Sequence, residues 1–255
     1  MMKRCIMKIV AVLAAAFTLA GFMGCGANGN SSDYDVEKTE ALADSPLKGK
    51  TLYFLGSSVT IGYGSQGMAF PHYIAKRDQC TVVVEAVTGT TLMDKNQNSY
   101  VHRMEFGSKF DKNADVDMFI CQLSTNDTGG GTVDMLNLGD IVGPTGNLSA
   151  YDKTTITGAM EYIITYVQQT WGCPVLFYSC SKRNDERYAK MVDRLNELSA
   201  LWGIGVLDLW NDEGFNNITT AQRKLWMKDE THPTKAGYIE WWTPIFEQFL
   251  YAYAK

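Results

Sequence analysis

The stretch Thr51–Thr60 reads Thr-Leu-Tyr-Phe-Leu-Gly-Ser-Ser-Val-Thr, a short apolar run followed by a turn of small residues. The run Thr51–Leu55 is continuous rather than alternating, which is typical of a strand buried on both faces of a parallel sheet. The same pattern returns four times, over Thr81–Val87, Asp117–Leu123, Pro174–Tyr178 and Gly205–Leu209. We therefore predict a five-stranded parallel sheet.

Longer segments with helical spacing separate or follow these runs. Apolar residues recur at intervals of three and four over Thr154–Trp171, Asp185–Trp202 and about Thr234–Tyr253. Alternating strands and helices favour one three-layer α/β/α sandwich with right-handed crossovers. The polar, glycine-rich segment Thr128–Asp152 shows neither pattern, and we interpret it as a surface insertion near the functional site.

Composition excludes three classes of protein. The chain has 255 residues, of which 45% are apolar and 20% charged, as in a globular protein. Its formal net charge is −5, whereas a nucleic-acid-binding face needs positive charge. After residue 25, no apolar stretch is long enough to span a membrane. The six cysteines lack the paired spacing of a structural zinc site.

The N-terminus is expected to export the protein. Cations precede the short apolar run Ile9–Ala20 and small residues follow it, which is the layout of a secretory signal over residues 1–24. Gly24-Cys25 at the expected cleavage site resembles the lipidation site of bacterial lipoproteins. We expect Cys25 to anchor the exported protein by a lipid. The alternative is a plain signal peptide with an incidental cysteine, which would release a secreted protein.

The next segment, residues 25–47, has almost no apolar side chains and predicts a flexible tether before a domain over residues 48–255. Disulfides are possible outside the cytosol. However, Cys173 and Cys180 flank a strand roughly 20 Å long, which is beyond the reach of a disulfide. Cys121 lies within an apolar run and is predicted to be buried. We expect mostly free thiols at Cys80, Cys121, Cys173 and Cys180.

Residues that follow the predicted strands carry the candidate chemistry, because ligands of parallel α/β sheets bind beyond the carboxyl ends of the strands. Gly56-Ser57-Ser58 follows the first strand, Thr88-Gly89-Thr90 the second and Ser124-Thr125-Asn126-Asp127 the third. Asp229-Glu230-Thr231-His232 precedes the last helix. A serine, a glycine, an amide and an Asp-x-x-His pair should therefore meet at one edge of the sheet.

These residue types are the parts of an acyl-transfer site. A serine hydroxyl such as that of Ser58 needs an adjacent base, and a histidine such as His232 is the usual one. Asp229, three residues earlier, can orient the imidazole and stabilise its protonated form. The backbone amides of Ser58 and Gly89 and the side-chain amide of Asn126 are candidate donors for an oxyanion hole.

The four blocks together resemble those of the SGNH hydrolases, the GDSL esterase/lipase superfamily, and the resemblance covers about residues 50–252. It implies a flavodoxin-like sandwich, Ser58 as nucleophile, and no cofactor or metal. Two positions depart from the family's motifs. Ser57 stands in place of the usual aspartate, which blurs which serine attacks, although third place in the block favours Ser58. Ser124 replaces a glycine and leaves Asn126 in register.

The expected function is an extracytoplasmic serine esterase that forms an acyl-enzyme. Its substrate would be a small-molecule or carbohydrate ester. Because of the expected location outside the cell, a carbohydrate or cell-wall O-acetyl esterase is the first candidate. An acyltransferase would share the first half-reaction and is an open alternative, as is a non-catalytic lipoprotein that binds glycans or other solutes. We expect no nucleic-acid partner, and membrane contact only through the lipid on Cys25.

Other signals are weaker. The glycines of Gly62-x-Gly64-x-x-Gly67, with Glu85 further on, match a dinucleotide-binding fingerprint. Gly62 lies seven residues beyond Leu55, however, whereas the fingerprint begins at the strand end. The remaining histidines, His72 and His102, are interpreted as structural or surface residues, and Asp127 as a hydrogen-bonding residue of its loop.

Overall fold

The computed structural model describes residues 28–254, and a five-stranded parallel sheet in the order β2-β1-β3-β4-β5 forms its centre. The strands are β1 (Thr51–Gly56), β2 (Thr81–Ala86), β3 (Met118–Gln122), β4 (Val175–Tyr178) and β5 (Gly205–Leu207). Each strand falls within its predicted run or passes it by one residue. All residues of β3 and β4 are buried, as their unbroken apolar runs indicated. The predicted flavodoxin-like sandwich is confirmed.

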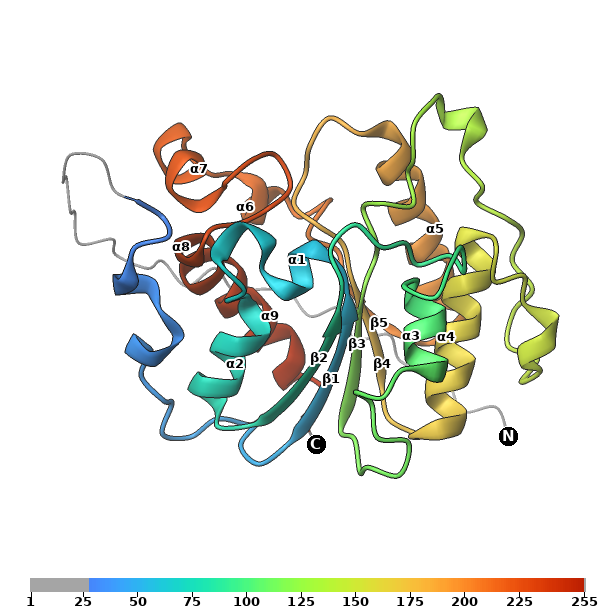
Figure 1. Ribbon diagram of the computed structural model, residues 1–255, viewed down its shortest axis with the longest axis horizontal. Coiled ribbons are helices and arrows are strands. Elements are labelled where there is room, and N and C mark those ends of the chain that lie inside the picture. The colour runs from blue at the N-terminus through green and yellow to red at the C-terminus, as the bar shows by residue number, and fades with distance from the viewer. Residues whose placement is uncertain (1–27, 255) are drawn as a thin grey trace, which may run out of the picture.

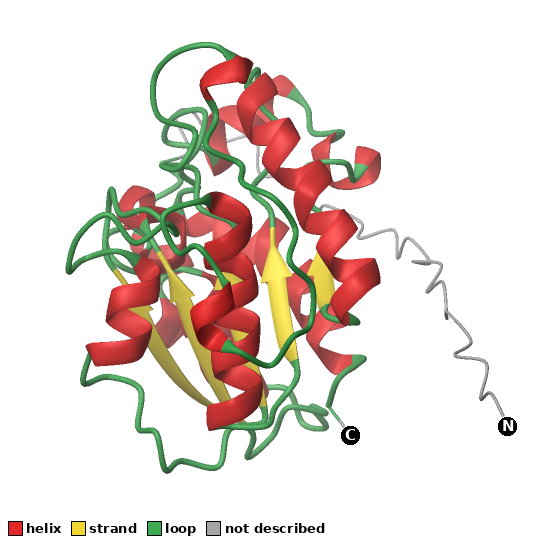
Figure 2. Ribbon diagram, turned by 90° about the vertical axis from the view of Figure 1, so that its right-hand side faces the viewer, coloured by secondary structure: helices red, strands yellow, loops and turns green. Residues whose placement is uncertain are grey.

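Helices cover both faces of the sheet (Figure 1). On one face lie α2 (Phe70–Asp78) and α9 (Thr243–Tyr251). On the other lie α3 (Tyr100–Phe106), α4 (Ile156–Thr170) and α5 (Glu186–Trp202), and Figure 2 looks onto this second face. The helices α4 and α5 confirm two predicted segments. Each begins where the side chain of the preceding residue accepts a hydrogen bond from the first turn.

Short helices occupy the connections: α1 (Ser58–Ile61), α6 (Glu213–Asn216), α7 (Thr220–Trp226) and α8 (Lys235–Gly237). The C-terminal helix expected over Thr234–Tyr253 is divided into α8, a π-helical turn (Tyr238–Trp242) and α9. Pro244 at the start of α9 has no N–H to donate, so the regular helical pattern cannot run through it. The segment Thr128–Asp152 is mostly exposed and contains only two 3₁₀ turns, Val133–Met135 and Leu148–Ala150. No helix within residues 28–254 is long and apolar enough to cross a membrane.

Residues 28–47, which we call the N-terminal strap, do not form the predicted flexible tether, because they pack against the domain. The strap contains two 3₁₀ turns, Ser32–Tyr34 and Val36–Lys38, and ends at the fully buried Leu47. Asp35 pairs with the buried Lys235 at 2.5 Å. Composition predicted flexibility here, but these few specific contacts offset the low apolar content. The expected signal peptide (residues 1–24) and Cys25 lie outside the described residues.

The strap also touches the loops at the carboxyl edge of the sheet. The side chain of Asn30 donates to the carbonyl of Gly64 at 2.9 Å and accepts from the backbone N–H of Lys235 at 3.0 Å. The Gly29 carbonyl accepts from the N–H of Ala236 at 2.9 Å. The strap therefore joins the loop after α1 to the segment that carries His232.

Candidate active site

The chain leaves the sheet in a tight turn at the end of β1. Gly56 ends the strand, Ser57 precedes α1 and Ser58 is its first residue. A Cβ atom at Gly56 would overlap the hydroxyl of Thr60, so only glycine fits this close approach. The turn places Ser58, which is 4% exposed, at the carboxyl edge of the sheet.

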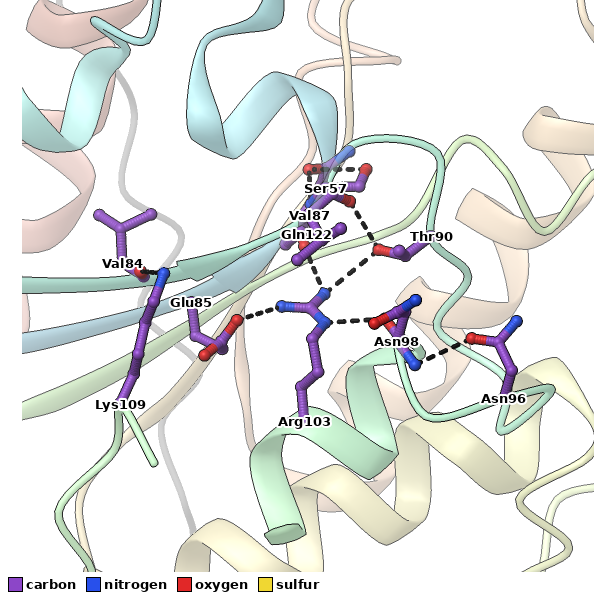
Figure 3. A network of polar contacts seen from close by, with 11 residues as sticks. Ser57, Val84, Glu85, Val87, Thr90, Asn96, Asn98, Arg103, Lys109 and Gln122 are labelled. Atoms are coloured by element: carbon purple, nitrogen blue, oxygen red, sulfur yellow. Dashed lines mark hydrogen bonds and ion pairs between the residues drawn. The ribbon is translucent and has the colours of Figure 1, made fainter. Parts of the chain in front are cut away.

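A buried side chain on β3 holds this turn. The carbonyl oxygen of the Gln122 amide accepts from the Ser57 N–H at 3.0 Å (Figure 3). It also accepts from the Thr60 hydroxyl at 2.7 Å. The Thr60 hydroxyl also lies 2.7 Å from that of Tyr178 on β4. Gln122 was not among the predicted site residues. Its signal in the sequence is a lone amide within an otherwise apolar run, and it satisfies a backbone N–H that leaves the sheet ladder here.

His232 and Asp229 complete a chain of hydrogen bonds to Ser58. Nε2 of His232 lies 2.9 Å from Oγ of Ser58. Nδ1 of His232 lies 2.9 and 2.8 Å from the two carboxylate oxygens of Asp229. The same carboxylate accepts from the backbone N–H groups of Thr231 and His232, both at 2.8 Å, so the Asp-x-x-His turn is closed on itself.

The side chains of His232 and Asp229 differ in their exposure to solvent. The side chain of His232 is 18% exposed and that of Asp229 is 45% exposed. Partial burial tends to raise the pKa of Asp229, but hydrogen bonds from the His232 ring and the turn amides outweigh it and leave the pKa below its usual value. Asp229 is therefore ionised wherever an imidazole titrates.

The glycine loop after α1 packs directly against His232. A Cβ at Gly64 would overlap the carbonyl oxygen of Pro233 and would lie 2.9 Å from Cβ of His232. Tyr63, which is 51% exposed, sets its ring 4.9 Å from the imidazole, and Nζ of Lys228 lies 4.2 Å from the centre of the tyrosine ring. Gly64, the second glycine of the dinucleotide-like pattern, thus lies against the His232 segment.

The candidate oxyanion donors lie in loops that meet at Thr90. Nδ2 of Asn126 donates to the Thr90 carbonyl at 2.9 Å and lies 3.3 Å from Oγ of Ser57. Gly89, one residue before Thr90, has a φ of +77° in the exposed turn after β2. The hydroxyl of Ser124 also donates to the Thr90 carbonyl, at 3.2 Å. The serine that replaces the family's glycine is thus used in the hydrogen-bond network.

Asp127, His72 and His102, which we interpreted as structural or surface residues, make local packing or hydrogen-bond contacts. Asp127 is buried and accepts from the N–H groups of Leu92 and Met93 at 2.6 and 3.1 Å. Its burial raises the pKa of its carboxyl despite these hydrogen bonds. Nδ1 of His72 accepts from the Ala69 N–H at 3.1 Å where α2 begins, and the ring of His102 packs on Phe106.

Cys121, Cys180 and Glu85 lie outside the hydrogen-bonded series of Ser58, His232 and Asp229. Cys121 and Cys180 are fully buried, and burial raises the pKa of both thiols. Glu85, the acidic residue of the dinucleotide-like pattern, pairs with Arg103 at 2.8 Å. Within residues 28–254, no three His, Cys, Asp or Glu side chains are grouped to hold a metal ion.

The chain is similar to several solved structures. A Lactobacillus plantarum protein aligns with a TM-score of 0.61 at 20% identity, covering 81% of this chain and 96% of that one. A Bacteroides ovatus protein assigned as a GDSL-like lipase aligns with a TM-score of 0.56 at 16% identity, covering 80% and 98%. A family two carbohydrate esterase from Clostridium thermocellum, in complex with cellohexaose, aligns with a TM-score of 0.52 at 13% identity, covering 83% and 65%. These identities support the fold alone.

The sequence itself is matched at the level of the family. No curated protein matches it. The model of the GDSL-like lipase/acylhydrolase family matches residues 54–238, a range that includes Ser58, Asn126 and His232. The chain therefore belongs to the GDSL-like lipase/acylhydrolase family.

Proposed function

We propose that the protein is a serine esterase that hydrolyses carbohydrate esters, with O-acetyl groups as the first candidates, through an acyl-enzyme. The observation that carries this proposal is the unbroken chain from the hydroxyl of Ser58 through the imidazole of His232 to the carboxylate of Asp229. A protein that only binds glycans has no need of this series of hydrogen bonds. Membership of an acylhydrolase family adds the reaction class.

In the proposed mechanism, Nε2 of His232 takes the proton of Ser58 as Oγ attacks the ester carbonyl. The negative charge that develops on the carbonyl oxygen is held by the amides of Ser58 and Gly89 and by Asn126, each contributing about 3 kcal/mol. Protonated His232 then gives its proton to the leaving alcohol. Water, activated by His232, releases the acyl group and restores Ser58.

A carbohydrate alcohol is supported by two observations. The structural neighbours include carbohydrate esterases, one of them bound to cellohexaose. In this chain, the half-exposed ring of Tyr63 lies beside His232, and sugar rings favour such aromatic surfaces. An acyltransferase would use the same first half-reaction, and competition between an acceptor alcohol and water distinguishes it from a hydrolase.

An extracytoplasmic location, with a lipid on Cys25, is part of the proposal and is supported by the signal-like N-terminus. Three residues lie between Cys25 and the packed Gly29, and the four Cα-to-Cα steps span about 14 Å at most. A lipid at Cys25 would therefore hold the His232 side of the domain close to the membrane surface. This differs from the long tether that composition suggested.

The identity of the nucleophile is tested by Ser58→Ala and Ser57→Ala in the chain from residue 26 onward. We expect Ser58→Ala to abolish hydrolysis of 4-nitrophenyl acetate and the adduct that a fluorophosphonate forms, because within residues 28–254 no other hydroxyl contacts Nε2 of His232. Ser57→Ala should keep at least about a tenth of the activity, since the Ser57 hydroxyl lies against Gln122 and Asn126 and not against His232. Intact mass and steady-state rates measure both. Full activity of Ser58→Ala would refute the mechanism.

The packing of Gly64 against the histidine segment is tested by Gly64→Ala. The added methyl group must displace Pro233 and His232, so we expect kcat to fall about 10- to 100-fold. The matched control is Gly130→Ala, where an added Cβ meets nothing within 4 Å. Thermal melting is measured alongside the rates. Equal rates in the two variants would contradict the inferred role of the contact.

The role of Asp229 is tested by Asp229→Asn. Despite partial burial, the hydrogen bonds from the His232 ring and the turn amides hold the pKa of the Asp229 carboxyl below its usual value, so an ionised acceptor lies against Nδ1 of His232 at neutral pH. We expect kcat to fall about 100-fold in the variant, because the neutral amide is a poorer orienting partner for the ring. Steady-state rates at neutral pH measure the effect, with thermal melting as the control for folding. A kcat equal to that of the unaltered enzyme would exclude this role for Asp229.

The anchor is tested by Cys25→Ala in the full chain expressed in a bacterial host. We expect the unaltered protein in the membrane fraction and the variant in the soluble extracytoplasmic fraction, because one lipidated cysteine is replaced. The diagnostic measurement is the mass of the N-terminal peptide. An unmodified Cys25 in that peptide would refute lipidation while leaving the esterase proposal intact.

A further inference from the structure

A buried arginine lies directly behind the candidate active site. Arg103 on α3 is 7% exposed and points its guanidinium at the ends of β1 and β2 (Figure 3). Nε donates to the Asn98 carbonyl and Nη1 to Glu85, both at 2.8 Å. Nη2 donates to the Gly56 carbonyl at 2.8 Å and to the Thr90 hydroxyl at 3.2 Å. One side chain thus contacts the nucleophile turn and the loop of the oxyanion glycine.

The contact with Gly56 adds to a weak bond of the sheet. In the ladder between β1 and β2, the Gly56 carbonyl faces the N–H of Val87, but that distance is 3.4 Å. Such a bond is weak, and a buried carbonyl needs a partner. Arg103 supplies a second, shorter bond at 2.8 Å. The Gly56 carbonyl thus keeps a strong partner at the point where the chain after β2 continues through Val87 into the turn of Gly89.

Thr90 links the Arg103 contacts to the loop that carries Asn126. Its hydroxyl donates to the Val87 carbonyl at 2.7 Å while it accepts from Arg103. Its carbonyl accepts from Nδ2 of Asn126 at 2.9 Å and from Oγ of Ser124 at 3.2 Å. The Gly56, Thr90 and Asn126 segments are thereby linked through a single guanidinium.

We infer that Arg103 is a positioning residue that sets the spacing of the oxyanion donors on the three loops that carry Ser58, Gly89 and Asn126. This inference rests on the proposed function. Removing the guanidinium should let the loop of Gly89 and Thr90 shift relative to Ser58. The Ser58–His232 contact should survive, because Gln122 and the Asp229 turn hold those residues independently.

A buried ion pair of this kind is not explained by stability alone. Arg103 and Glu85 are each 7% exposed, and pairs so deeply buried contribute little more than an apolar pair of the same volume. Arginine is also the side chain that can donate to all four acceptors described above, because its planar guanidinium directs its N–H groups along several fixed directions. A lysine ammonium is a single point and cannot reach all four.

The test compares the unaltered enzyme with the double variant Arg103→Met/Glu85→Leu and with Arg103→Lys. The double variant replaces the ion pair by apolar groups, so we expect it to fold. Exhaustive reaction with a fluorophosphonate counts the sites that retain a working Ser58–His232 pair. We expect the labelled fraction to be unchanged and kcat per labelled site to fall about 10- to 100-fold, with a smaller change in KM.

Thr90→Val and Thr90→Ser provide a second, milder pair. Valine lacks the hydroxyl that Arg103 contacts and should lower kcat per site about 10-fold, whereas serine keeps it and should stay near the unaltered rate. Lys109→Met is the control for charge, because Lys109 is exposed and donates only to the Val84 carbonyl on β2. Its rate should not change.

The outcomes separate the two proposals. If the variants lose labelled sites but keep full kcat at the sites that remain, Arg103 is merely structural and the inference is overturned. If the double variant does not fold, the Thr90 pair decides, and equal rates for valine and serine overturn the inference. An unaltered enzyme that neither reacts with the fluorophosphonate nor turns over esters would overturn the proposed function itself.

Discussion

The candidate active site depends on one constraint, which is that backbone groups at the end of a buried strand need hydrogen-bond partners. At the end of β1, inside the protein, the carbonyl of Gly56 keeps only a long 3.4 Å bond to the N–H of Val87, and the N–H of Ser57 finds its partner outside the ladder. Arg103 donates to the first and Gln122 accepts from the second. Without these two side chains, the sharp turn before Ser58 would leave the Ser57 N–H unpaired and the Gly56 carbonyl with one weak bond. An unpaired buried polar group costs about 1–3 kcal/mol.

The same principle shapes the histidine side of the site. Asp229 accepts from two amides of its own turn as well as from the ring of His232, so the turn and the imidazole are fixed by one carboxylate. The packing of Gly64 brings the loop after α1 against this turn from one side. Asn30 of the N-terminal strap bonds to the Gly64 carbonyl, which extends the support to residues near the start of the described chain.

Much of the fold could be predicted because its strands are buried on both faces. That burial demands unbroken apolar runs, and such runs are easily located in the sequence. The blocks around Ser58, Gly89, Asn126 and His232 could be placed because each follows a strand or precedes a helix. The structure brings Ser58, His232 and Asp229 into one hydrogen-bonded chain, as their motifs indicated.

The sequence could not reveal the side chains that support the candidate site from behind it. Arg103 lies on a short helix whose polar residues resemble those of any surface helix, and only the fold shows that it is buried against Glu85. The strap was misjudged for a related reason. Composition averages over the whole segment, whereas its packing depends on a few contacts, such as Asp35 with Lys235 and the burial of Leu47.

The two departures from the family's motifs fit one account. Where the motif has aspartate, Ser57 offers Asn126 an uncharged oxygen at 3.3 Å, a weaker partner than a carboxylate. The firmer bond of Asn126 is to the Thr90 carbonyl at 2.9 Å. Ser124, which replaces a glycine, donates to that same carbonyl, and Arg103 holds the Thr90 hydroxyl. Beside an uncharged Ser57, Thr90 thus accepts hydrogen bonds from Asn126, Ser124 and Arg103, and the loops of the candidate oxyanion donors converge on it.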